Sequence, residues 1–260
     1  MNVVVPFLKK LLSSKETFFT LFVCSIGVLI VNLFFTFTPA FWSIMFIGKK
    51  HILGGITFQD VMWAIFFLGL MQIYYRKRDI AKLDLYSTKN YLPKDFETII
   101  GEQELTEVIR NVREDSKDSM GILPYMILQI ALQFRTNNSI SITSDFLSKQ
   151  LELFLHSVEL RYNQLKYIIW LIPSLGFMGT VYGIGLAVSQ LGEGSLEDPE
   201  LLTKMAGSLG VAFNTTLLAL VLSVILQFFT QHFEAQEESL INKFGKYILD
   251  NLINKLVEKS

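Results

Sequence analysis

Four polar residues interrupt two long apolar segments in the C-terminal half of the sequence. Asn214, Thr215 and Thr216 follow one another inside a run of 29 residues without Asp, Glu, Lys or Arg, and Thr180 lies inside a similar run of 26. Each run exceeds the ~20 residues that a helix needs to cross a bilayer. Polar groups in hydrocarbon require partners or water. These residues therefore indicate an ion pathway or a partner-facing surface, with simple hydrogen bonds between helices as the alternative.

Small residues accompany these polar groups at helical spacing. In both segments they recur at steps of three and four, which places them on one face of each helix. Small residues let helices approach closely in lipid, where no hydrophobic force holds helices together. Helix packing alone is the simplest interpretation of the glycines. The residues that we expect to pack around the pathway are Pro173, Gly176, Gly179, Gly183, Ala212 and Ala219.

The interior of these segments holds no Asp, Glu, Lys, Arg or His. A proton relay needs a titrating group, and threonine hydroxyls do not titrate at physiological pH. If the chain conducts protons, the carboxylate must come from another polypeptide. Alternatively, hydroxyl and carbonyl oxygens, completed by a partner's carboxylate, coordinate sodium. The spacing of the three histidines fits no metal site, and we expect no cofactor, no catalytic residue and no enzyme activity.

Four membrane spans fit the charge distribution, at about 18–41, 56–75, 167–190 and 206–230, with Asp60 at the edge of the second. The fold class is therefore an all-α polytopic membrane protein. We expect a cytoplasmic N-terminal segment (1–17), a first transmembrane hairpin (18–75), a helical cytoplasmic domain (76–166), a channel hairpin (167–230) and a cytoplasmic C-terminal helix (231–260). Lys and Arg number 23, and all but three lie in the segments assigned to the cytoplasm, which places both termini there. The net charge of −1 does not favour nucleic acid as a partner.

The cytoplasmic segments also carry helical patterns. Apolar residues at helical spacing predict a helix over 96–120, which Gly121 and Pro124 interrupt, and a short buried helix over 124–134. Thr143 or Ser144 then offers an N-cap. No helix breaker precedes the third span, so we expect one continuous helix from about Ser144 to Gln190. The fourth span likewise continues to about residue 243.

The segment 175–184 reads LGFMGTVYGI and resembles the L-G-x-x-G-T-V-x-G-I motif of the MotA/TolQ/ExbB proton channel family. The segment 211–220, VAFNTTLLAL, is similar to the A-x-x-T-x-x-G-L element of its next helix. Aligning Ala219 with that glycine places Thr216 on the second family threonine, with Thr215 a close rival. The glutamate common in the TolQ/ExbB branch is Val211 here. Four spans match the flagellar stator branch, whereas the motifs are closer to TolQ and ExbB.

The resemblance implies that Thr180 and Thr216 face a central pore and the membrane aspartate of a partner. It further implies a homopentamer in a bacterial inner membrane, around single-span chains of the ExbD, TolR or MotB kind. Flow of H+ or Na+ would then drive mechanical work. Alternatives within the class are a flagellar stator subunit and a defence-system motor. Outside the class, the alternative is a non-conducting oligomeric membrane scaffold.

The charge distribution makes a first prediction about topology. A cysteine introduced at Ser139 lies in the cytoplasm and should resist an impermeant thiol reagent in intact cells. A cysteine at Ser195, in the short acidic loop between spans three and four, should react. Labelling at Ser139 under these conditions would contradict the orientation.

Overall fold

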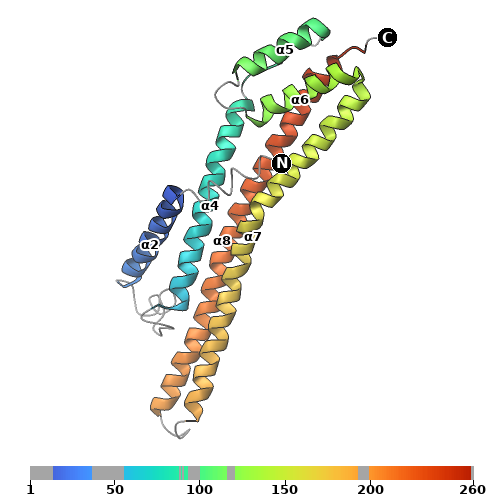
Figure 1. Cartoon of the computed structure of the whole chain (residues 1–260). Helices are drawn as coiled ribbons and strands as arrows, with labels where there is room; N and C mark the ends of the chain where they lie inside the picture. Colours follow the sequence, from blue (N-terminus) through green and yellow to red (C-terminus); the bar gives the residue numbers. More distant parts are fainter. Residues whose placement is uncertain are drawn as a thin grey trace. The chain divides into compact units, whose positions relative to one another are not determined.

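The computed structural model describes residues 14–36, 56–87, 89, 91–92, 100–115, 121–192 and 199–258. The regular structure of these residues is helical (Figure 1), apart from one isolated bridge between Ile100 and Leu256. The described helices are α2 (Ser14–Thr36), α4 (Phe58–Ser87), α5 (Glu102–Asp115), α6 (Ile122–Asn137), α7 (Ile140–Leu191), α8 (Pro199–Asn251) and the 3-10 turn η1 (Ile253–Lys255). The predicted all-α class is confirmed for this part of the chain.

Two of the helical segments are long and apolar enough to cross a membrane: Ile140–Leu191 and Pro199–Lys255. These contain the predicted third and fourth spans. A shorter apolar stretch, Phe22–Phe34, lies in α2. The two N-terminal spans therefore remain a prediction, and residues 37–41 of the first lie outside the described residues.

The continuous helix predicted before the third span is present, but it begins earlier than expected. α7 starts at Ile140, two residues after Asn138, which adopts the left-handed conformation (φ 47°) and ends α6. The Thr143 hydroxyl donates back to the carbonyl of Ser139 at 2.7 Å. The prediction of an N-cap at Thr143 or Ser144 was wrong, because Thr143 already lies inside the first turn.

The helices predicted over 96–120 and 124–134 correspond to α5 and α6, although residues 96–99 and 116–120 lie outside the described residues. α6 begins at Ile122, so Pro124 lies in its first turn and does not interrupt a helix. Proline is tolerated there because the first backbone N–H groups of a helix have no intrahelical acceptor.

The chain divides into two compact units. Unit 1 comprises Met1–Tyr74 and Gln164–Thr230, and unit 2 comprises Tyr75–Asn163 and Gln231–Ser260. In unit 1, α2 lies beside α4 (Figure 1), and the Asn32 side chain donates to Asp60 Oδ1 at 2.9 Å. Asp60 also accepts the backbone N–H of Thr57 at 2.9 Å, while the Thr57 hydroxyl accepts the N–H of Asp60 at 3.1 Å. This reciprocal capping box fixes the start of α4.

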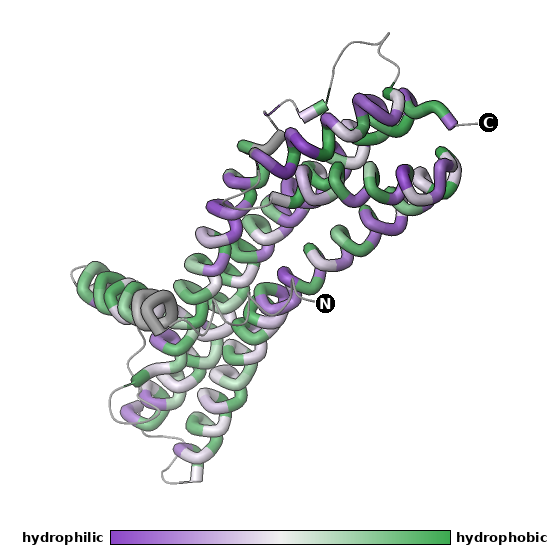
Figure 2. Tube along the Cα trace, turned by 45° about the horizontal axis from the view of Figure 1, so that its top comes forward, coloured by the Kyte–Doolittle hydropathy of each residue, from purple (hydrophilic) through white to green (hydrophobic). Residues whose placement is uncertain are grey.

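Apolar side chains cover the outward surface of unit 1. Phe177 on α7 and Phe213 on α8 are 67% and 69% exposed, and hydrophobic residues extend along α2 as well (Figure 2). A large exposed apolar surface marks contact with lipid or another protein. This surface is consistent with the membrane location predicted for these helices.

Unit 2 has a separate hydrophobic core. It joins α5, α6, η1 and the parts of α7 and α8 in this unit through buried residues that include Met126, Ile130, Phe244 and Ile248. A backbone hydrogen bond joins the C-terminal end of unit 2 to the residue that precedes α5 by two positions: the Ile100 N–H donates to the Lys255 carbonyl at 2.8 Å. Unit 2 is thus a helical domain with its own packed interior.

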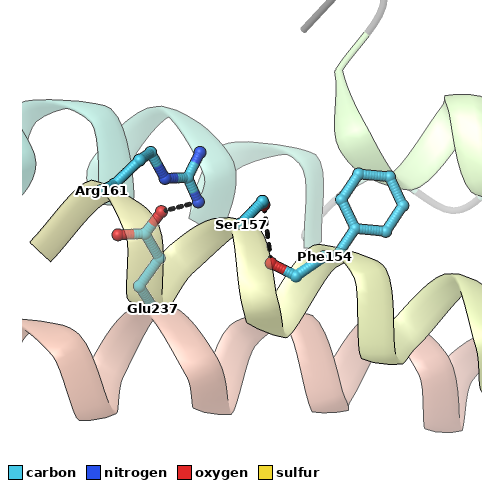
Figure 3. A network of polar contacts seen from close by, with 4 residues as sticks. All are labelled: Phe154, Ser157, Arg161 and Glu237. Carbon is cyan, nitrogen blue, oxygen red and sulfur yellow. Dashed lines mark hydrogen bonds and ion pairs between the residues drawn. The ribbon is translucent and has the colours of Figure 1, made fainter. Parts of the chain in front are cut away.

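Unit 2 also contains a buried network of charged side chains. The Arg161 guanidinium donates to Glu237 Oε1 at 2.5 Å, joining α7 to α8 (Figure 3). Arg76 from α4 lies over the ring of Tyr162, 5.9 Å from its centroid. Arg76 is 7% exposed and Glu237 is 3% exposed. The network therefore contains two cations and one anion in a largely water-excluded place.

Burial dominates the electrostatics of this network, which lies outside the predicted spans. It lowers the pKa of Arg76, with a further contribution from the positive charge of Arg161. Burial likewise raises the pKa of Tyr162, as does the neighbouring carboxylate of Glu237. Tyr162 therefore stays neutral at physiological pH. Glu237 is the anion shared by both cations, while Asp79 also acts on Arg76. Removal of Glu237 would take away the ion pair of Arg161 and part of the charge compensation of Arg76.

The network predicts a large effect of a single substitution. Glu237→Gln should lower the melting temperature of the detergent-purified protein strongly, because breaking a buried pair costs about 3–5 kcal/mol. The loss of stability should lie at the low end of this range, because the Arg161 side chain is still 24% exposed to solvent.

The matched control is Glu159→Gln, which removes an exposed i,i+3 partner of His156 and should cost less than about 1 kcal/mol. Equal effects of the two substitutions would contradict the importance of the buried pair.

Candidate functional site: the hydroxyl cluster of the α7–α8 hairpin

In unit 1, three glycines of α7 bring its backbone against α8. A Cβ placed on Gly179 would lie 2.6 Å from Thr215 Oγ1, and one on Gly183 would lie 2.8 Å from the backbone nitrogen of Ala212. A Cβ on Gly176 would collide with that of Ala219. No larger residue fits at these positions. At these three glycines, the backbone of α7 therefore packs closely against α8.

The close approach brings hydroxyl groups from both helices together. Thr180 Oγ1 and Thr216 Oγ1 form a hydrogen bond with each other. Thr180 Oγ1 also lies 3.2 Å from the Gly176 carbonyl and 3.1 Å from the Ala212 carbonyl. Thr216 Oγ1 lies 3.4 Å and 3.2 Å from the same two oxygens. Four oxygen atoms, two from each helix, thus form one cluster.

The structure distinguishes the two adjacent threonines of α8. Thr215 is fully buried against α7, and its hydroxyl lies 2.9 Å from the Ala212 carbonyl and 3.0 Å from the Val211 carbonyl. Thr216 is only partly buried, as is Thr180. Thr215 therefore packs the hairpin, whereas the Thr180–Thr216 pair retains a side open to a further group.

Asn214 is not brought into this cluster. Its side chain is half-buried and makes no hydrogen bond with the described residues. Because successive residues of an α-helix are ~100° apart, Asn214 lies ~160° around the axis of α8 from Thr216. The three consecutive polar side chains thus point in three different directions around α8. Of these, only Thr215 and Thr216 contact α7.

Pro173 is inside α7, two turns from Thr180 and on the same face by its spacing. Because proline has no N–H, the Ile169 carbonyl lacks the donor that a regular helix supplies four residues later. Val211, at the position of the family's glutamate, is a buried apolar residue. This part of the hairpin consequently offers neutral oxygen atoms and no carboxylate.

Sequence reasoning did not single out the ionic network of Arg76, Arg161, Tyr162 and Glu237. One signal was present: Glu237 is four and seven residues before Ile241 and Phe244, so a carboxylate lies on the apolar face of α8. A charge on a core-facing position indicates a buried partner. Its partner Arg161 is distant in sequence and becomes identifiable only from the fold.

The described residues form a helical protein with two helices long and apolar enough to cross a membrane. Where these two helices meet, uncharged hydroxyl and carbonyl oxygens lie together. Residues 122–246, almost half of the chain, match the profile of the MotA/TolQ/ExbB proton channel family. This is the family predicted from the sequence motifs, and the prediction of a resemblance to it is confirmed over this segment. A comparison with curated proteins and with solved structures gives no match.

Two glycines of α7 provide a direct test of the close approach. Gly183→Ala should disrupt the hairpin, because the added Cβ meets the backbone of α8 at 2.8 Å and overpacking costs about 1–3 kcal/mol. Gly185→Ala is the control, since its Cβ would meet nothing within 4 Å and alanine favours a helix. The melting temperature should fall for the first variant only; a fall for both would point to a different packing.

Proposed function

We propose that this chain is the ion-channel subunit of an inner-membrane motor that converts H+ or Na+ flow into mechanical work. The Thr180–Thr216 hydroxyl pair carries the proposal. It joins the two helices that match the family motifs, it lies within the predicted bilayer depth, and it keeps a partly exposed side. Partly exposed polar groups at that depth mark pathways for ions or substrates.

The proposed mechanism requires a second chain. Threonine hydroxyls and backbone carbonyls hold no charge and release no proton at physiological pH. We propose that a single-span partner supplies a membrane carboxyl that carries the ion past the pair. Several copies of this chain would surround the partner, with the apolar outward surface of unit 1 in contact with lipid and with neighbouring copies. Both termini and unit 2 would lie in the cytoplasm.

A non-conducting scaffold would use the same small residues for packing alone. Thr215 fits that role, since it is fully buried and donates within its own helix. Thr216 is not explained in this way, because packing does not require a second, partly exposed hydroxyl beside the first. The contrast between these two neighbours separates the proposals experimentally.

The proposed function predicts ion flux only from the two-component complex. Liposomes containing this chain alone should be as tight to H+ and Na+ as empty ones. Co-reconstitution with the single-span partner that co-purifies with it should produce a flux, measured with an ion-sensitive dye. Steady flux from this chain alone would contradict the need for a partner.

In the same assay, Thr180→Val and Thr216→Val should abolish the flux while the complex still assembles. Each keeps the side-chain shape and deletes one hydroxyl. Ser174→Ala is the matched control on α7, because that hydroxyl donates to the Trp170 carbonyl of its own helix at 2.9 Å. Full flux in both threonine variants would exclude these two hydroxyls from the ion pathway.

A further inference from the structure

Three polar atoms of the ionic network in unit 2 are buried and have no hydrogen-bond partner among the described residues. They are Arg161 Nε, Tyr162 Oη and Glu237 Oε2. Tyr162 is 0% exposed and Glu237 is 3% exposed, so bulk water does not reach these two side chains. Buried polar side-chain atoms of native proteins are, in the large majority, hydrogen-bonded to protein or to ordered water. Three such atoms in one network therefore indicate a bound partner.

The three atoms belong to groups that adjoin one another. Arg161 Nη2 donates to Glu237 Oε1 at 2.5 Å (Figure 3). Nε belongs to the same guanidinium and Oε2 to the same carboxyl, so both unpartnered atoms flank this contact. The Tyr162 phenol lies near the same carboxyl, since Glu237 raises the pKa of Tyr162, but the two side chains do not have the geometry of a direct hydrogen bond.

The chemistry of the three atoms selects a small neutral ligand that both donates and accepts. Arg161 Nε only donates, Glu237 Oε2 only accepts, and the neutral Tyr162 phenol does either. A cation at this place would face Arg161, and an anion would face Glu237. The part of the chain that the structure describes contains no group of three His, Cys, Asp or Glu residues that could hold a metal ion. Water has two hydrogens and two lone pairs, and it satisfies all three atoms at once.

We propose that Arg161, Tyr162 and Glu237 hold a buried water molecule that bridges α7 and α8. The water accepts the N–H of Arg161 Nε, donates one hydrogen to Glu237 Oε2 and forms its third hydrogen bond with Tyr162 Oη. A buried water makes about three hydrogen bonds to polar groups that otherwise have no partner. The inference stands apart from the proposed function, because the network lies outside the predicted spans.

The water has a specific role for the charge of Glu237. A carboxylate in a largely water-excluded place stays ionised when hydrogen bonds reach its oxygens. Arg161 supplies the hydrogen bond to one oxygen of Glu237, and the water supplies the hydrogen bond to the other. A water-mediated hydrogen bond is nearly as favourable in enthalpy as a direct one. The water is thus a structural component of the junction between α7 and α8, and the Tyr162 phenol holds it in place.

The first test removes the phenol oxygen from the full chain, purified in detergent. If Tyr162 Oη binds the water, Tyr162→Phe loses one hydrogen bond, and the melting temperature should fall by about 2–4 °C. A buried hydroxyl without a partner would give the opposite result, because its removal relieves an unfavourable burial. Tyr125→Phe is the matched control in unit 2, since Tyr125 is 40% exposed, and it should leave the melting temperature unchanged. An unchanged or raised melting temperature for Tyr162→Phe overturns the proposal.

The second test separates a bound water from a direct hydrogen bond between Tyr162 and Glu237. X-ray pulses generate hydroxyl radicals from water molecules in place, and mass spectrometry measures the oxidation of each side chain. Radicals from bulk water do not reach a buried ring, so rapid oxidation of Tyr162 requires a water bound beside it. Phe244, which is 1% exposed in the hydrophobic core of unit 2, is the control. After correction for the intrinsic reactivity of the two rings, Tyr162 should be oxidised several-fold faster than Phe244. Equal rates overturn the proposal.

Discussion

The close approach of α7 and α8 is the constraint on which the candidate site depends. Hydrogen bonds operate over about 2.7–3.2 Å, so hydroxyls on two helices share carbonyl acceptors only if the backbones nearly touch. Glycine at 176, 179 and 183 provides that contact, since a Cβ at any of them would enter α8. The buried Thr215 fills the space over Gly179 and fixes the register. Thr216, the next residue, then meets Thr180.

The same contact solves the problem of polar groups in a membrane. Hydroxyls in hydrocarbon are costly unless they are hydrogen-bonded, and here each of the three has a carbonyl oxygen within reach. These three hydroxyls are thus satisfied within the hairpin itself. The partly exposed pair of Thr180 and Thr216 adds neutral hydroxyl groups to a largely apolar hairpin. Strong charges are kept elsewhere, in the ionic network of unit 2, which joins its helices through Arg161 and Glu237.

Sequence reasoning succeeded where periodicity and residue size determine the outcome. The spacing of the small residues identified the facing surfaces of α7 and α8, and the absence of breakers predicted two long helices. It failed at the start of α7, because a threonine hydroxyl can either cap a helix or donate to a carbonyl of the preceding turn. In the structure Thr143 does the second, donating to the Ser139 carbonyl. It left Thr215 and Thr216 unresolved, because adjacent residues differ by only ~100° around a helix. Packing against Gly179 resolves them.

The neutrality of the cluster has a consequence for transport. A fixed carboxylate beside Thr216 would bind a passing cation strongly, and an ion held by the stationary chain no longer travels with a partner. Val211 places an apolar side chain one helical turn from Thr215, where such a carboxylate would stand. Neutral oxygens would bind a cation weakly, because in the proposed function most of the attraction comes from the charge of the partner. In the proposed function, weak binding by this chain would leave the ion on the partner, which a site that must bind and release repeatedly requires.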